Sequence, residues 1–249
     1  MGKGGQTATP KDNLTVGLDC AGLGSDLYGL KKMPHKFTKI SLKFWSEEDK
    51  TKQALFKFLH SDIISEGETV HYPSMSNRSV KEMPTVDVYS WGPPCPPFSK
   101  QGSHKGPMDI RSQPLKLGVE YIAYKRPRVF IMEEVENFVN EYADLADQLL
   151  ETLRSCQYTV KVHGMNTRGH GIPQNRSRVY ITGVKLEGNI KAVNTPEEIE
   201  PFPFKQFIDT TDREDRANTE KMNTVAKRNF DRNIKLMESK VISFFKLTL

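Results

Sequence analysis

The sequence predicts an α/β fold in which a mostly parallel sheet carries helices on both faces. Short apolar runs alternate with stretches of helical spacing throughout residues 14–184. One run, VFIM at residues 129–132, is apolar at every position, which is typical of strands buried on both faces. Strands that alternate with helices of this length are typical of doubly wound parallel sheets.

The apolar runs place the expected elements in a regular order. In the first half of the chain, we expect strands at 15–19 and 40–45 and helices at 26–33 and 50–59. A polar, turn-rich stretch at 66–84 favours loop with irregular helix. Later strands are expected at 86–90, 129–132, 159–165 and 178–184, and the last two are expected to pair. Helical spacing of Leu115, Val119 and Ile122 predicts a helix that Pro127 closes off, and that of Leu145, Leu149 and Leu153 predicts the next helix.

Composition narrows the class of protein. With 27% charged and 37% hydrophobic residues, and no apolar run near the roughly 18–20 residues of a bilayer span, the chain is not expected to be embedded in a membrane. The first residues include no apolar segment of the kind found in secretory signals, so a secretory signal is not expected. A nuclear or cytoplasmic location is expected instead. Three scattered cysteines without a CxxC pair predict no metal site. The net charge of +5 permits a polyanionic partner without requiring one.

Chemistry-bearing residues follow the predicted strands at their carboxyl ends, where doubly wound sheets bind ligands. The turn AGLG, residues 21–24, lets backbone N–H groups approach a ligand, although a tight strand–helix turn explains it equally well. Glu47 suits a ribose diol, but a charge at a helix start is also favourable. Asp62 can accept from an exocyclic amine or act as a simple cap. Together, each after a strand, the three predict a nucleoside cofactor.

A second group of residues predicts covalent chemistry. Cys95 stands between four prolines in GPPCPPFS, a stiff loop that suits a pre-positioned nucleophile better than an inert thiol. The next strand ends at Glu133, so a thiol and a carboxylate are expected to face one cleft. Gln174 precedes Arg176 and Arg178, whose two-residue spacing puts both guanidinium groups on one face of a strand. Either arginine can bind a substrate carbonyl or phosphate, or form a salt bridge.

In this order, the motifs resemble those of the cytosine-5 DNA methyltransferase family, over roughly residues 14–184. The resemblance implies a Rossmann-like class I fold that uses S-adenosylmethionine. Its segments are AGLG, SEEDK, HSDI, GPPCPPFS, KQGSHKGPMDIR, PRVFIMEEV and NTRGHGIPQNRSRVYITG.

The resemblance also implies a role for individual residues. Cys95 would attack carbon 6 of cytosine, Glu133 would contact ring N3 and the exocyclic amine, and Arg178 would hold O2. Gln174 and Arg176 belong to the same catalytic group. The expected cofactor-binding residues are Ala21, Gly22, Leu23, Gly24, Glu47, Glu48, Asp62, Ile63 and Pro93. The expected substrate-binding residues are Ser99, Gln101 and Gly102 in the loop that closes over the target base.

The chain also departs from the family pattern. Cys20 stands where Phe is usual, and Glu134 stands where Asn is usual and would place a like charge beside Glu133. The family's target-recognition domain and its C-terminal motifs are not found after Arg178. We therefore expect a disordered segment at 1–13, a catalytic domain at 14–184, and a linker with an incomplete recognition region at 185–249, where 220–245 is a charged, peripheral helix.

Three functions remain open on this sequence. The first is an active DNA cytosine-5 methyltransferase, with or without a second chain that supplies target recognition and the C-terminal motifs. The second is a non-catalytic module that binds S-adenosylmethionine or DNA. The third is a tRNA cytosine-5 methyltransferase of the same fold. DNA is the expected partner, RNA is the alternative, and no membrane partner is expected.

Overall fold

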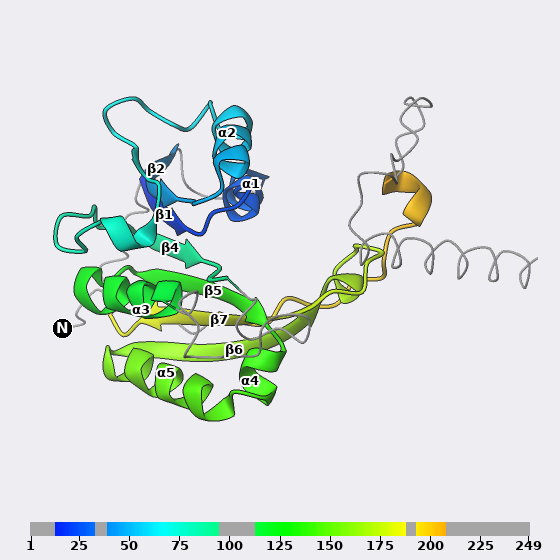
Figure 1. The fold of residues 1–249 in the computed structure, drawn as a ribbon. Helices are drawn as coiled ribbons and strands as arrows, with labels where there is room; N and C mark the ends of the chain where they lie inside the picture. Colours follow the sequence, from blue (N-terminus) through cyan, green and yellow to red (C-terminus); the bar gives the residue numbers. More distant parts are fainter. Residues whose placement is uncertain (1–12, 33–38, 95–112, 188–192, 208–249) are drawn as a thin grey trace, which may run out of the picture. The chain divides into compact units, whose positions relative to one another are not determined.

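The computed structural model describes residues 13–32, 39–94, 113–187 and 193–207. Within them, a seven-stranded sheet has the order β3-β2-β1-β4-β5-β7-β6 (Figure 1). The strands are β1 (Asn13–Asp19), β2 (Lys39–Ser46), β3 (Val70–Tyr72), β4 (Val88–Trp91), β5 (Val129–Val135), β6 (Tyr158–Asn166) and β7 (Ser177–Lys185). The helices are α1 (Ser25–Lys32), α2 (Lys50–Leu59), α3 (Gln113–Lys125), α4 (Asn137–Asn140) and α5 (Ala143–Ser155).

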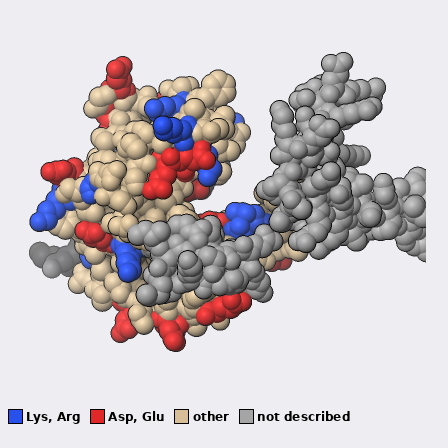
Figure 2. All heavy atoms as spheres, viewed as in Figure 1, with Lys and Arg blue, Asp and Glu red and all other residues tan. Residues whose placement is uncertain are grey.

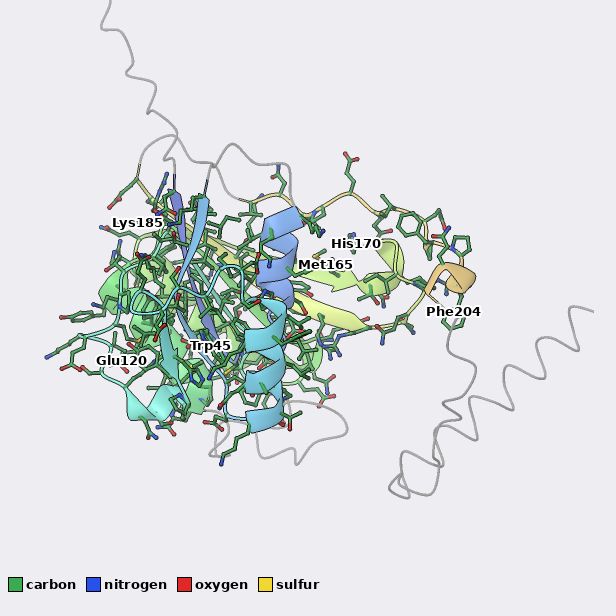
Figure 3. All side chains as sticks on the ribbon, turned by 90° about the horizontal axis from the view of Figure 1, so that it is seen from above. Trp45, Glu120, Met165, His170, Lys185 and Phe204 are labelled. Carbon is green, nitrogen blue, oxygen red and sulfur yellow. The ribbon has the colours of Figure 1, made fainter. Side chains whose placement is uncertain are left out.

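The sheet is mostly parallel, as the alternation of strands and helices predicts. Strands β3, β2, β1, β4 and β5 pair in parallel. Strand β7 lies between β5 and β6 and is antiparallel to both. It forms a long hairpin with β6. Figure 3 labels Lys185 at one end of this hairpin and His170 beyond the other end. The expected pairing of the last two strands is therefore confirmed.

Two apolar cores lie on opposite faces of the sheet. The larger core packs α3 and α5 against β4, β5 and β7, with Tyr89, Tyr121 and Phe130 fully buried. The smaller core packs α1 and α2 against β1 and β2, around Trp45 and Phe56, whose rings stack at 4.2 Å. Helices thus cover both faces, because successive residues of a strand point to opposite sides. The carboxyl ends of the parallel strands are left to meet at one edge.

The structure differs from the expected elements in the stretch 66–84. Strand β3 lies there and pairs with residues Phe44 to Ser46 of β2. A 3-10 helix, Met75–Asn77, follows it. Three residues are too few to show the alternation that identifies a strand. Helix α3 ends at Lys125, before Arg126 in a left-handed conformation (φ 54°), and so it stops ahead of Pro127 as expected.

The chain divides into two compact units, residues 1–201 and 202–249. The first unit includes the sheet and the segment 193–201, which pairs with the region after β6 through Ile199 and His170. The second unit is described only at 202–207, where Phe204–Phe207 form a 3-10 turn. The expectations for residues 1–12 and 220–245 fall outside the described residues. Among the residues that the structure describes, no helix is long and apolar enough to cross a membrane.

Candidate functional site

The turn after β1 adopts a conformation that requires glycine at one position. Cys20, Gly22 and Gly24 all have positive φ, at 51°, 55° and 73°. A Cβ at Gly24 would lie 2.4 Å from Nε2 of His60, a buried ring that also contacts the Leu23 carbonyl at 2.9 Å. The absence of a side chain at Gly24 therefore lets the start of α1 pack directly against the end of α2.

Glu47 holds the same turn from the end of β2. One carboxylate oxygen accepts from the Gly22 N–H at 2.8 Å, and the other accepts from the N–H groups of Glu48 at 3.1 Å and Asp49 at 3.0 Å. Asp49 in turn caps α2 by accepting from the Thr51 N–H. The Glu47 side chain is therefore fixed before any ligand arrives.

A hollow of about 330 Å³ opens between these two turns and the end of β4. Its volume lies within the range of small-molecule sites. The lining combines the acidic residues Glu47 and Glu48, the basic residue Lys52, the sulfur-bearing residues Cys20 and Met75, and the prolines Pro94 and Pro114. A molecule with a hydroxyl-bearing, partly apolar body and charged groups of both signs matches this lining.

Cys20 contributes an unreactive thiol to the hollow. Its Sγ lies 3.6 Å from Sδ of Met75. Burial raises the pKa of the Cys20 thiol well above its ordinary value, and the negative charges of Asp19, Glu47 and Glu48 raise it further. The thiol therefore stays protonated at neutral pH, and Cys20 is a small wall residue of the hollow.

Asp62 does not line this hollow. It follows α2 rather than a strand, so the expectation that it ends a strand is wrong. Its carboxylate is exposed and pairs with Nζ of Lys31 at 2.8 Å, and that hydrogen bond lowers the pKa of Asp62. Ile63 packs beside it against the smaller core. The strand after Asp62 is β3, and the 3-10 helix that follows β3 brings Met75 to the wall of the hollow.

Glu133 and two arginines form a second cluster at the same edge. Oε1 of Glu133 accepts from Nε of Arg178 at 2.9 Å and lies 3.4 Å from Nη2 of Arg176. A Cβ on Gly92, at the end of β4, would lie 3.4 Å from Oε2 of Glu133. Since Gly92 also lines the hollow, the carboxylate cluster and the hollow adjoin at this residue. The structure thus brings together three of the residues that the sequence singles out.

Other expected residues lie in different surroundings. Gln174 is exposed, and its backbone carbonyl accepts from the Thr167 hydroxyl. Glu134 points to the opposite face of β5 from Glu133, is fully buried, and accepts from the Val135 N–H at 2.9 Å. The expected like-charge contact between the two glutamates is therefore not present. Pro93 is buried beside the hollow.

The remaining site residues fall in the stretch 95–112, outside the described residues. They are Cys95, Ser99, Gln101 and Gly102.

Acidic and basic side chains are interspersed on the face of the molecule seen in Figure 2.

Comparisons with known proteins agree on one family. The profile of C-5 cytosine-specific DNA methylase matches residues 20–244. The type II methyltransferase M.NlaX of Neisseria lactamica is 32% identical over 165 residues, which cover 66% of this chain and 50% of the relative. M.Bsp6I of a Bacillus species is 34% identical over 146 residues, which cover 56% and 45%.

Two solved structures share the fold at low sequence identity. The Entamoeba histolytica methyltransferase EhMeth aligns with a TM-score of 0.62 at 15% identity, over 80% of this chain and 61% of that one. Spodoptera frugiperda DNMT2 aligns with a TM-score of 0.59 at 16% identity, over 79% and 60%. The chain spans about half or less of the length of the curated relatives named above. Because the profile covers nearly the whole sequence, the chain belongs to the C-5 cytosine-specific DNA methylase family.

Proposed function

We propose that this chain transfers a methyl group from S-adenosylmethionine to carbon 5 of cytosine in DNA. The observation that carries the proposal is the place of Glu133. Its carboxylate is bound by Arg178 and lies beside Gly92, three residues before Cys95 and at the border of the hollow. A carboxylate and an arginine beside a ligand-sized hollow, with a cysteine next in sequence to the hollow residue Pro94, are the groups that this reaction needs.

The hollow fits S-adenosylmethionine. Glu47, at the end of β2, suits the two ribose hydroxyls, and its three N–H partners already orient it. Glu48 adds a second carboxylate, which favours a positively charged ligand. Met75, Pro94 and Pro114 offer apolar surface to a flat base. When bound, the cofactor supplies a methyl group activated by a positive sulfur.

The contribution of Asp62 and Ile63 to this site is not supported by their position. We assign the cofactor to the turn 21–24, to Glu47 and Glu48, and to the segment around Pro93. This assignment includes the backbone of Ala21 and Leu23, which belong to the same turn.

The protein's own residues would perform the remaining steps. The Cys95 thiolate forms a bond to carbon 6 of cytosine, while a proton from Glu133 reaches ring N3 and the electron pair moves to carbon 5. Carbon 5 would then form a bond to the methyl carbon as the bond between that carbon and the cofactor sulfur breaks, which leaves S-adenosylhomocysteine. Removal of the proton from carbon 5 by a base would expel the Cys95 thiolate, and return of the N3 proton to Glu133 would restore the ring, which divides one difficult step into easier ones.

Arg178 and the loop after Cys95 would position the target base. Arg178 holds O2 of cytosine and, through its bond to Glu133, keeps the carboxyl aimed at the ring. Arg176 and Gln174 support this arginine from the same segment, and Ser99, Gln101 and Gly102 contact the target strand. The base must leave the DNA stack to reach Cys95, at a cost of a few kcal/mol.

Transfer of a radioactive methyl group to DNA tests the proposal, with Cys95→Ser as the control. We expect incorporation with the wild-type chain and none with the variant. A covalent complex should also form on DNA that contains 5-fluorocytosine, because fluorine at carbon 5 cannot leave as a proton does. Equal incorporation by Cys95→Ser would refute the covalent mechanism.

RNA is the second candidate substrate, since the sequence motifs leave open a tRNA cytosine-5 methyltransferase of the same fold. Parallel trapping on 5-fluorocytosine DNA and on 5-fluorocytosine tRNA separates the two. Adduct on tRNA alone would replace DNA by RNA in the proposal.

A second polypeptide segment is the proposed partner for target recognition. The curated relatives are about twice as long as the matched region or longer. An apolar hollow of about 340 Å³ on the α1 face of the sheet, lined by Val16, Leu30, Val88 and Ile131, offers a surface for such a segment. Calorimetric binding of S-adenosylmethionine without methyl transfer, alone and with candidate partner chains, would instead identify a non-catalytic binding module.

A further inference from the structure

A buried ion pair lies beneath the hollow, between Asp19 at the end of β1 and Arg78 after β3. Both side chains are almost fully buried, at 0% and 1% exposure. Nη1 and Nη2 of Arg78 donate to the two carboxylate oxygens of Asp19 in a bidentate pair. The same carboxylate accepts from the hydroxyls of Ser46 and Tyr89, each at 2.6 Å. Four hydrogen bonds therefore join β1, β2, β4 and the turn after β3 at one point.

The residues that form these hydrogen bonds lie close in sequence to residues that line the hollow. Asp19 precedes Cys20, whose N–H donates to the Ser46 hydroxyl at 3.3 Å, and Ser46 precedes Glu47. Arg78 directly follows the 3-10 helix Met75–Asn77, and Sδ of Met75 contacts Sγ of Cys20 at 3.6 Å in the wall of the hollow. Movement of the ion pair would therefore move both of these adjoining wall residues.

Neighbouring aromatic rings hold the guanidinium in place. The guanidinium carbon of Arg78 lies 5.6 Å from the centre of the Phe44 ring and 5.3 Å from that of Tyr72. Such contacts suit the flat guanidinium group better than a lysine ammonium. The geometry thus favours arginine at this position for its shape as well as for its charge.

The buried Asp19 carboxylate requires the counter-charge of Arg78. Glu47, Glu48 and Lys52 line the hollow, whereas Asp19 is fully buried and pairs with Arg78. Loss of Arg78 would leave the Asp19 carboxylate buried without its counter-charge, which is a strongly unfavourable state. The end of β1 would then shift to admit water or a proton.

We propose that the Asp19–Arg78 ion pair positions Met75 and the turn Ser74–Asn77 against Cys20, and thereby sets the affinity of the hollow for the nucleoside part of S-adenosylmethionine. The inference rests on the proposed function, because that function names the ligand. Arg78 does not line the hollow itself. It is a positioning residue that acts through Asp19 and through the turn.

The turn has a second contact that explains why its position matters. The Ser74 hydroxyl donates to the Glu48 carboxylate at 2.7 Å. The wall residue Glu48 and the turn after β3 therefore move together. A displaced turn would change both the apolar wall at Met75 and the orientation of the Glu48 carboxylate.

Calorimetric binding of S-adenosylmethionine to four variants of the full chain tests the proposal. Arg78→Met removes the charge, and Arg78→Lys keeps the charge but loses the bidentate geometry. Asp19→Asn/Arg78→Met removes both charges and leaves an acceptor for Ser46 and Tyr89. Arg128→Met removes a half-exposed arginine that lies 3.9 Å from the buried Asp87 carboxylate, which does not line the hollow, and is the matched control. All are measured below the melting temperature of the least stable variant.

We expect the Kd of Arg78→Met to rise about tenfold to a hundredfold, as misplaced binding groups produce. Arg78→Lys should fall between it and the wild type. In methyl transfer, KM for S-adenosylmethionine should rise with Kd while kcat changes by less than about threefold, since binding and not chemistry is altered. The double variant should regain melting temperature, because no buried charge is left alone, but should keep a raised Kd.

The outcomes separate this inference from the proposed function. A double variant that has the Kd of the wild type would show that the affinity of the hollow does not depend on the ion pair, and would overturn the inference. An equal rise of Kd in Arg128→Met would do the same. A wild-type chain that binds no S-adenosylmethionine would overturn the proposed function and this inference together.

Discussion

Nε of Arg178 donates a hydrogen bond of 2.9 Å to Oε1 of Glu133, from strand β7 to the neighbouring strand β5. The two residues are 45 positions apart in the chain. The antiparallel insertion of β7 beside β5 brings them together at the edge where β4 leads toward Cys95. Arg176 reaches the same oxygen at the longer distance of 3.4 Å and is more exposed.

The two arginines should therefore differ in their effect on methyl transfer. Arg178→Ala should lower kcat by about a hundredfold, since it removes a partly buried donor that orients Glu133 and holds the base. Arg176→Ala should lower kcat by about fivefold at most, because an exposed pair contributes about 1 kcal/mol or less. Arg154→Ala, on the exposed side of α5, is the control. Equal losses for Arg176→Ala and Arg178→Ala would contradict the geometry.

The strand that ends at Glu133 and the shared side of Arg176 and Arg178 follow from patterns that the sequence shows, whereas the contact between Glu133 and Arg178 is seen only in the structure. The apolar run before Glu133 predicts a buried strand, and the two-residue spacing of Arg176 and Arg178 predicts a shared face. Both features are local, so they are visible without a structure. The pairing of the last two strands is visible for the same reason.

The ion pair of Asp19 with Arg78 is not visible in this way. The two residues are 59 positions apart, and Arg78 lies in a stretch without periodicity. Strand β3 is equally hidden, because its three residues are shaped by pairing with β2 and not by their own pattern. Asp62 follows α2 and precedes β3, so the expectation that it comes after a strand is wrong for the same reason that β3 is hidden.

Gly24→Ala should destabilise the fold by about 2 kcal/mol or more. The residue has φ of 73°, and a Cβ would lie 2.4 Å from His60. Gly29→Ala is a matched control in the same region, because a Cβ there meets nothing within 4 Å and α1 gains a better helix former. That control should be stabilised by about 0.5–1 kcal/mol. Urea unfolding followed by the fluorescence of buried Trp45 and Trp91 measures both, and equal stability of the two variants would refute the steric argument.

His163 should make the fold sensitive to acid. Its two ring nitrogens bond the hydroxyls of Thr195 at 2.8 Å and Thr182 at 2.9 Å. Burial lowers the pKa of His163 below its ordinary 6.5, and the charge of Lys161 lowers it further. Below pH 6.5 the unfolded chain therefore binds a proton that the folded chain does not, so stability falls as the pH falls.

His163→Gln keeps polar atoms for the two threonines but cannot take up that proton. Urea unfolding of both proteins at pH 7.5, 6.5 and about 5.5 compares them. The wild type should lose more unfolding free energy than the variant on acidification, with the difference appearing below pH 6.5. Parallel pH profiles would show that His163 does not carry the effect.

Cys20 should resist alkylation in the folded protein. Because burial and the charges of Asp19, Glu47 and Glu48 raise its thiol pKa, the reactive thiolate is scarce at neutral pH. A Cys95→Ser/Cys156→Ser chain leaves Cys20 as its one cysteine. At pH 7.5, its reaction with iodoacetamide should be at least about tenfold slower in the folded chain than in urea, since each unit of raised pKa lowers the thiolate fraction about tenfold. The rate should also keep rising beyond the pH at which the unfolded thiol levels off. A folded chain that reacts as fast as the unfolded one would show that the thiol beside Met75 is ionised, and that the hollow is less negative than its three neighbouring carboxylates indicate.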